Sequence, residues 1–185
     1  MKELLKRIAK ALDDEGLAYM VIGGQAVLIY GEPRFTRDID ITVLVTPQNL
    51  NKVLEVVRKA GLEILVDDDI EKFVKDTWVL PAYDPDSGFR VDFIFSWTPY
   101  EKQAVERGRV IEVLGYPVKF ASPEDIIILK MISGRGRDLE DIAGIVRRVK
   151  NLDIEYIFQW LEVFEGLVGR NLRKEFRKIL QEEGR

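Results

Sequence analysis

The sequence predicts an α/β (α+β) fold that ends in a helical region. Up to about residue 120, short apolar stretches with the two-residue period of strands alternate with helical patterns. The segment Ser122-Pro123-Glu124-Asp125 is then typical of a capped helix start, and the helical pattern continues to the end of the chain. We expect a core over residues 1–120 and a helical region over 121–185 that packs on it, the two forming one structural unit.

The elements of the first half follow from periodicity and from stop signals. An amphipathic pattern predicts a helix that Gly16 ends, and Gly61 likewise ends a later helix that starts at Thr46-Pro47. The elements expected here are a helix over 3–15, a strand that ends at 22, a helix over 25–30, a strand over 38–45 and a helix over 47–60.

The elements of the second half are bounded by turn residues. The segment Asp84-Pro85-Asp86-Ser87-Gly88 has the chemistry of a hairpin loop, and Gly115-Tyr116 marks a second turn. The elements expected here are strands over 77–83 and 89–95, a helix over 99–107, strands over 109–114 and 117–120, and helices from 123 onward.

Composition narrows the chemistry that the protein can perform. The 185 residues include no Cys and no His, so thiol chemistry, disulfides, imidazole bases and the usual zinc sites are excluded. Acid–base or metal chemistry must therefore use carboxylates and lysine. Charged residues make up 32% of the chain, a balance typical of proteins from hot environments.

Net charge and hydropathy bear on partners and location. The net charge of −4 argues against broad electrostatic attraction to nucleic acid, so an RNA contact would require a local basic patch. Basic residues do cluster along residues 170–178, where solvated surface is the common alternative to nucleic-acid contact. Because no stretch approaches a membrane span, we expect a soluble, cytoplasmic protein with no membrane partner.

Two aspartates on one strand are the most informative motif. Asp38 and Asp40 project from the same face of their strand, and Gly23-Gly24 precedes Asp38 by fifteen residues. Two close carboxylates repel unless a cation lies between them, and Mg²⁺ prefers one or two carboxylates plus phosphate oxygens. Glycines let the backbone approach a ligand, and a helix start offers N–H groups to an anion. We expect a nucleoside triphosphate and a metal to bind side by side here.

A third carboxylate strengthens the metal interpretation. Asp92 lies among large apolar residues on a strand, where a lone charge would be costly to bury. If this strand neighbours that of Asp38, three carboxylates converge: Asp38 and Asp40 would hold a metal on the triphosphate, and all three a second metal near the attacking hydroxyl. Asp92 is also the candidate base. The alternative is that Asp38 and Asp40 lie in an exposed loop or edge without a metal.

The motif Gly23-Gly24, Arg34, Thr36, Asp38 and Asp40 resembles the nucleotidyltransferase superfamily of DNA polymerase beta in its minimal form. Within this superfamily, the chain more closely resembles the AbiEii-like nucleotidyltransferases, the toxin half of a type IV toxin–antitoxin class. Val91-Asp92, Lys130 and the segment from Asp138 to Ile142 match further motifs, so the resemblance covers residues 19–145. Gly24 departs from the serine of many members, which leaves phosphate contacts to the backbone.

The resemblance implies a mixed sheet flanked by helices and the transfer of a nucleoside monophosphate from a triphosphate to a hydroxyl. It implies two Mg²⁺ ions, with Mn²⁺ as the alternative, an RNA acceptor such as a tRNA end, and a cognate antitoxin as partner. A small-molecule acceptor, as in antibiotic nucleotidyltransferases, is the second reading. The competing class is a non-catalytic module that binds a nucleotide or a partner.

Several residues carry smaller predictions with open alternatives. Arg34 and Arg37 would neutralise phosphate or pair with the aspartates, and Thr36 would bind phosphate or cap the strand entry. Lys130 lies in an apolar helical run, which favours phosphate binding. Asp138 and Asp141 share a helix face, so we expect them at the nucleotide or orienting Lys130; ordinary helix charges are the alternative.

Overall fold

The computed structural model describes residues 1–32 and 35–185 and divides into two compact units. Unit 1 consists of residues 1–25 and 35–121, and unit 2 consists of residues 122–185 together with the segment that begins at Ala26. The expectation that a core and a helical region pack into one structural unit stays a prediction.

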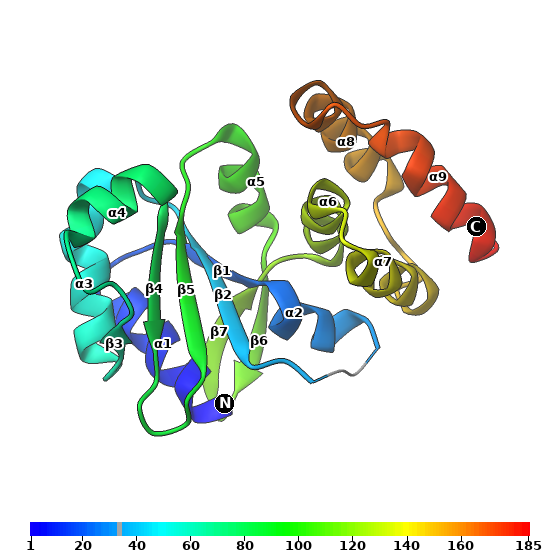
Figure 1. The fold of residues 1–185 in the computed structure, drawn as a ribbon. Helices are drawn as coiled ribbons and strands as arrows, with labels where there is room; N and C mark the ends of the chain where they lie inside the picture. The colour runs from blue at the N-terminus through cyan, green and yellow to red at the C-terminus, as the bar shows by residue number, and fades with distance from the viewer. Residues whose placement is uncertain (33–34) are drawn as a thin grey trace. The chain divides into compact units, whose positions relative to one another are not determined.

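Unit 1 is built on a seven-stranded mixed sheet with the order β3-β4-β5-β2-β1-β7-β6 (Figure 1). Strand β2 runs antiparallel to β1 and parallel to β5, and β1 runs parallel to β7. The predicted mixed sheet flanked by helices is therefore confirmed. The strands are β1 (Tyr19–Ile22), β2 (Asp38–Val43), β3 (Glu63–Ile64), β4 (Val79–Tyr83), β5 (Arg90–Phe95), β6 (Arg109–Val113) and β7 (Tyr116–Phe120).

Helices cover this sheet and bury their apolar faces. Helix α1 packs against α3 and β7, and its Leu4, Ile8 and Leu12 are almost fully buried, as the amphipathic pattern predicts. Helix α2 (Gly23–Tyr30) follows β1 directly and runs from unit 1 into unit 2. The other helices of unit 1 are α1 (Lys2–Asp14), the short 3₁₀ helix η1 (Pro47–Asn49), α3 (Leu50–Lys59), α4 (Ile70–Thr77) and α5 (Pro99–Arg107).

Unit 2 contains the C-terminal helices that the sequence predicts. Helix α6 packs against α7 and α8, and fully buried Ile127, Ile145 and Ile157 lie at the centre of this unit. The predicted cap is present, because the Ser122 hydroxyl accepts a hydrogen bond from the Asp125 backbone N–H at 3.1 Å. The helices are α6 (Pro123–Ser133), α7 (Gly136–Arg148), α8 (Ile154–Val168) and α9 (Leu172–Glu182).

Over the described residues, no helix combines the length and apolar character that crossing a bilayer requires.

Two elements of unit 1 are absent from the sequence prediction. Strand β3 has only two residues, too few for a period to emerge. Helix α4 lies directly before β4, and the Asp69 carboxylate caps it by accepting the Lys72 N–H at 2.9 Å. Helix α2 also begins at Gly23 rather than at residue 25, so the expected glycine turn is the first turn of the helix.

Candidate active site

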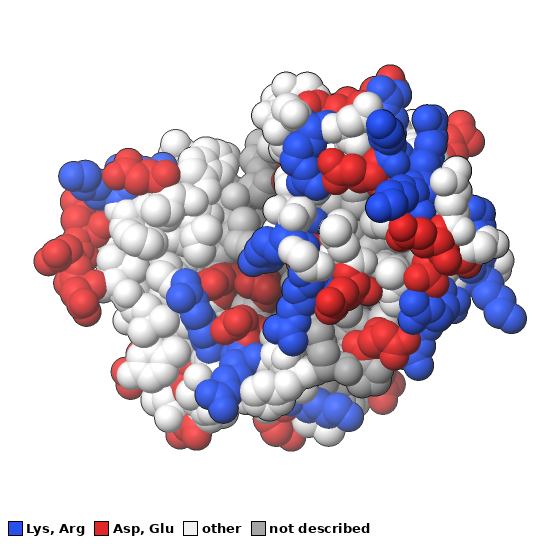
Figure 2. Space-filling model, turned by 45° about the vertical axis from the view of Figure 1, so that its right-hand side comes forward, with Lys and Arg blue, Asp and Glu red and all other residues white. Residues whose placement is uncertain are grey.

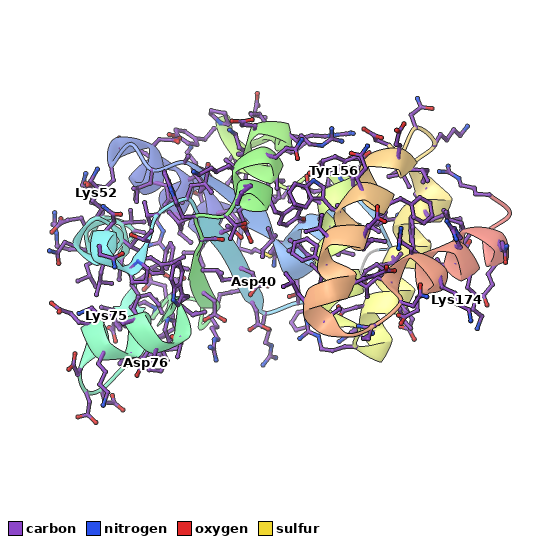
Figure 3. The ribbon with its side chains drawn as sticks, turned by 90° about the horizontal axis from the view of Figure 1, so that it is seen from above. Asp40, Lys52, Lys75, Asp76, Tyr156 and Lys174 are labelled. Carbon is purple, nitrogen blue, oxygen red and sulfur yellow. The ribbon has the colours of Figure 1, made fainter. Side chains whose placement is uncertain are left out.

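The register of β2 against β5 brings the predicted aspartates together. Asp40 is the direct partner of Asp92, and Asp38 is the partner of Arg90. Paired residues of neighbouring strands lie about 4.8 Å apart and project from the same face of the sheet. Asp38, Asp40 and Asp92, called the carboxylate cluster below, therefore share one face with Arg90. Figure 3 labels Asp40 on β2.

Apolar residues on the opposite face fix this arrangement. Ile39, Ile41, Val91 and Phe93 alternate with the cluster and have exposed fractions of 1% or less. A slip of one residue in either strand would move these side chains out of the core, so the hydrophobic pattern specifies the register. Asp38 remains exposed, whereas Asp40 and Asp92 are half-buried.

Gly23 makes room for the Asp40 carboxylate. Ile22 is the β1 partner of Asp40, and α2 begins at the next residue, Gly23, with a φ of +61°. A Cβ atom at Gly23 would lie 2.0 Å from Asp40 Oδ2, far inside contact distance. The position therefore requires glycine for two reasons: its positive φ and the closeness of the carboxylate.

Arg90 is a site residue that the sequence analysis missed. Its Nε donates to Asp92 Oδ1 at 2.9 Å and to Oδ2 at 3.1 Å. The hydrogen bond from Arg90 to Asp92 and the charge of that carboxylate raise the pKa of the guanidinium, and the charges of Asp38 and Asp40 raise it further. Arg90 thus interacts with the whole carboxylate cluster. The signal was its two-residue spacing from Asp92 on a strand.

The carboxylate oxygens of the cluster suit a divalent cation such as Mg²⁺ that is already bound to phosphate oxygens and water. Within residues 1–32 and 35–185, no three acidic side chains already surround a common point, and Asp92 is bound to Arg90. Mg²⁺ needs only one or two carboxylates when phosphate oxygens and water complete its shell. Asp40 and its partner Asp92 supply such a pair, and the missing side chain of Gly23 makes room for the Asp40 carboxylate.

Thr36 and Arg37, which lie just before β2, contact neighbouring residues of the same segment. Thr36 Oγ1 and the Asp38 N–H are 3.4 Å apart, which corresponds to the strand-entry alternative. The Arg37 guanidinium lies 5.4 Å from the centre of the exposed Phe35 ring. Arg34 lies outside the described residues. Roles of these residues and of Gly24 in nucleotide binding stay predictions.

A family model described as "Nucleotidyl transferase of unknown function (DUF2204)" matches residues 1–177. The chain belongs to this nucleotidyltransferase family. The protein is therefore an enzyme of the nucleotidyl-transfer class, which the motifs of residues 23–40 predict. No curated protein matches the sequence at a significant level.

Solved structures of nucleotidyltransferases share the fold. The antibiotic-resistance factor ANT(2'')-Ia is 17% identical, with a TM-score of 0.62 over 96% of this chain and 97% of that chain. The lincosamide antibiotic adenylyltransferase LnuA is 19% identical, with a TM-score of 0.54 over 78% of this chain and 96% of that chain. The toxin MenT4 from Mycobacterium tuberculosis is 15% identical, with a TM-score of 0.55 over 90% of this chain and 64% of that chain. At these identities the likeness concerns the fold.

In this protein, Lys130 lies in unit 2 and binds acidic residues. Its Nζ lies 2.8 Å from Asp138 Oδ1 and 2.6 Å from Asp141 Oδ2. Burial alone would raise the pKa of Asp138, but hydrogen bonds from Lys130, Arg135 and Ser133 lower it to about 2. Both aspartates thus contact Lys130, which agrees with the alternative that they orient this lysine. The roles of Lys130, Asp138 and Asp141 in nucleotide binding stay predictions.

Several basic residues of segment 170–178 pair with acidic neighbours. Arg173 contacts Glu162 and Glu165, and Arg170, just before α9, contacts Glu175. Lys174, exposed on α9, is labelled in Figure 3. On the face drawn in Figure 2, blue basic and red acidic side chains are interspersed. Part of the positive charge of segment 170–178 is therefore paired with acidic side chains.

Proposed function

We propose that the carboxylate cluster is the centre of metal-dependent transfer of a nucleoside monophosphate from a nucleoside triphosphate to an acceptor hydroxyl. The pairing of Asp40 with Asp92 beside Gly23 carries this proposal. A non-catalytic module would have no need of three carboxylates on one face, because like charges at this spacing repel.

The reaction is an in-line displacement at the α-phosphorus. The acceptor oxygen forms a bond to that phosphorus, the bond to the bridging oxygen of the β-phosphate breaks, and pyrophosphate leaves. The acceptor proton passes to Asp92, since the sequence has no histidine to receive it. Backbone N–H groups at the start of α2, next to Gly23 and Gly24, would bind the triphosphate oxygens.

The metal would be held by Asp38 and Asp40 at the triphosphate, and by these residues with Asp92 at the acceptor. Two Mg²⁺ ions, or Mn²⁺ in their place, would neutralise charge on the phosphate oxygens and acidify the acceptor hydroxyl. The chain itself supplies orientation, because the buried apolar face of β2 and β5 holds the carboxylates in register.

The acceptor that we propose is RNA, such as a tRNA end, with a cognate antitoxin as regulator in the AbiEii-like manner. The motif order from Gly23 to Asp141 supports this assignment, and MenT4 is itself a toxin. In this proposal the core and the C-terminal helices act as one structural unit, with Lys130 contributing to phosphate binding.

A small hydroxylated molecule is the second candidate acceptor. The net charge of −4 and the ion pairs of Arg173 favour it, because both weaken attraction to a polyanion. One structure of ANT(2'')-Ia is a complex with adenylyl-2''-tobramycin, and LnuA was solved with lincomycin bound.

The test is an incubation with each of the four α-labelled triphosphates and Mg²⁺, with total RNA or a metabolite extract as the acceptor. We expect label on RNA, with loss of transfer in EDTA and recovery with Mg²⁺ or Mn²⁺. Label on a small molecule would identify the second candidate instead. Absence of transfer to either pool, with all four triphosphates, would contradict the catalytic proposal.

A further inference from the structure

We propose that Arg90 is an exchangeable counter-cation: it binds Asp92 while the metal is absent, and binds the triphosphate once a metal has taken its place. The proposal rests on the proposed function, since it concerns the same carboxylate cluster. It assigns a role to a residue outside the glycine and aspartate motifs.

The contact geometry supports the first half of the exchange. A single guanidinium nitrogen of Arg90 lies within 3.1 Å of both Asp92 oxygens. These are the oxygens that a metal at the acceptor side would need. A metal at Asp92 would place a second positive charge beside the guanidinium, so Arg90 and the metal compete for this carboxylate through their mutual repulsion.

The burial of the pair supports movement of the arginine rather than of the aspartate. The Arg90 side chain is 52% exposed, whereas the Asp92 side chain is 19% exposed. Asp92 is held by the flanking residues Val91 and Phe93, which are fully buried. A long, half-exposed arginine can swing through solvent at low cost, while the aspartate stays fixed by the sheet.

The charge balance supports the second half of the exchange. Without a metal, three carboxylates share one face with Arg90, which offsets part of their repulsion. Binding of a metal–triphosphate complex brings phosphate oxygens with excess negative charge to the same face. A released guanidinium suits these oxygens, since its fork of donors matches phosphate as well as carboxylate.

The experiment compares Arg90→Met with wild type by calorimetry, using Mn²⁺ alone and then Mn²⁺ with a non-hydrolysable triphosphate analogue. Because the competitor is removed, we expect Arg90→Met to bind Mn²⁺ alone about fivefold more tightly. Because a phosphate contact is lost, the same variant should bind the triphosphate complex about fivefold or more weakly. Arg58→Met is the matched control, since Arg58 pairs with Glu55 outside the cluster.

The opposite signs of the two shifts separate this role from a structural one. A residue that only supports the fold would shift both affinities in the same direction, and that result, or two unchanged affinities, would overturn the proposal. If Mn²⁺ binds wild type and Arg90→Met equally well, only the role of Arg90 is wrong. If neither protein binds Mn²⁺ or the triphosphate complex, the proposed function is wrong as well.

Discussion

Two acidic clusters among the described residues differ in their burial and in the cations that they bind. In unit 1, Asp92 of the carboxylate cluster binds Arg90, whose side chain is 52% exposed. In unit 2, Asp138 and Asp141 face two cations, Lys130 and Arg135. The triad of Lys130, Asp138 and Asp141 is also buried, with side-chain exposed fractions between 5% and 8%.

We propose that this difference separates a metal-binding centre from a buried ion-pair cluster. An ion pair out of water must be balanced and hydrogen-bonded, because an uncompensated buried charge is costly. Close carboxylates at a partly exposed position repel one another less in water, and they can take up a divalent cation. We therefore expect substitutions in unit 2 to affect stability first, and substitutions in unit 1 to affect metal binding and transfer first.

The largest effect on stability is expected for Lys130→Met. Removal of the ammonium leaves two buried carboxylates without their main partner, so the free energy of unfolding should fall by about 3–5 kcal/mol. Urea unfolding followed by circular dichroism measures it. Lys174→Met, at an exposed position of α9, should stay within ~0.5 kcal/mol of wild type. Because Lys130 is also proposed to contribute to phosphate binding, transfer should fall as well; a Lys130→Met protein as stable as wild type would contradict the comparison.

The next effect is expected for Gly23→Ala. The new Cβ would collide with Asp40 Oδ2, and the positive φ adds about 1–2 kcal/mol of strain. Gly16→Ala is the matched control, because Gly16 has a φ of +64° and no atom within 4 Å of its added Cβ. Stability of both variants should fall, but transfer should fall about tenfold or more only in Gly23→Ala, as Asp40 is displaced. Equal transfer by the two variants would show that Asp40 tolerates displacement.

The smallest effect is a dependence of stability on acid pH that arises in unit 2. The pKa of Asp138 is about 2 in the folded protein, below its value of about 3.9 in an unfolded chain. The stabilisation is therefore present above pH ~4 and is lost as the pH falls through 2, with a magnitude of at most about 2 kcal/mol. Unfolding free energies measured between pH 5 and 2 should fall less steeply in Asp138→Asn. Identical pH profiles would contradict the ion pair.

The sequence could predict the parts of the fold that have strong periods or caps. The two-residue alternation from Asp38 to Val43 placed the aspartates on one face, and Ser122 marked the start of α6. Helix α4 was missed although Ile70, Phe73 and Val74 have helical spacing, because the acidic run Asp67-Asp68-Asp69 resembles a loop. Its cap, Asp69, was the available signal.

The candidate site could be proposed from residue types, whereas the strand pairing that brings its residues together could not be predicted. Carboxylates after a glycine motif indicate a metal and a phosphate, whatever the register. The pairing of Asp40 with Asp92, and of Asp38 with Arg90, depends on which strands become neighbours, a long-range property of the sheet. For the same reason, the sequence could not assign the neighbours of Arg90 or explain why Gly23 excludes a side chain.

Asp40→Asn tests the central claim that the carboxylate cluster of unit 1 binds a metal for transfer. Transfer should fall by ~10²-fold or more. The melting temperature without metal should stay equal or rise because repulsion is relieved, and the stabilisation by Mg²⁺ with a triphosphate should disappear. Thermal melts with and without these ligands, beside the labelled transfer assay, measure all three. A destabilised Asp40→Asn protein that transfers as well as wild type and is indifferent to Mg²⁺ would contradict the account.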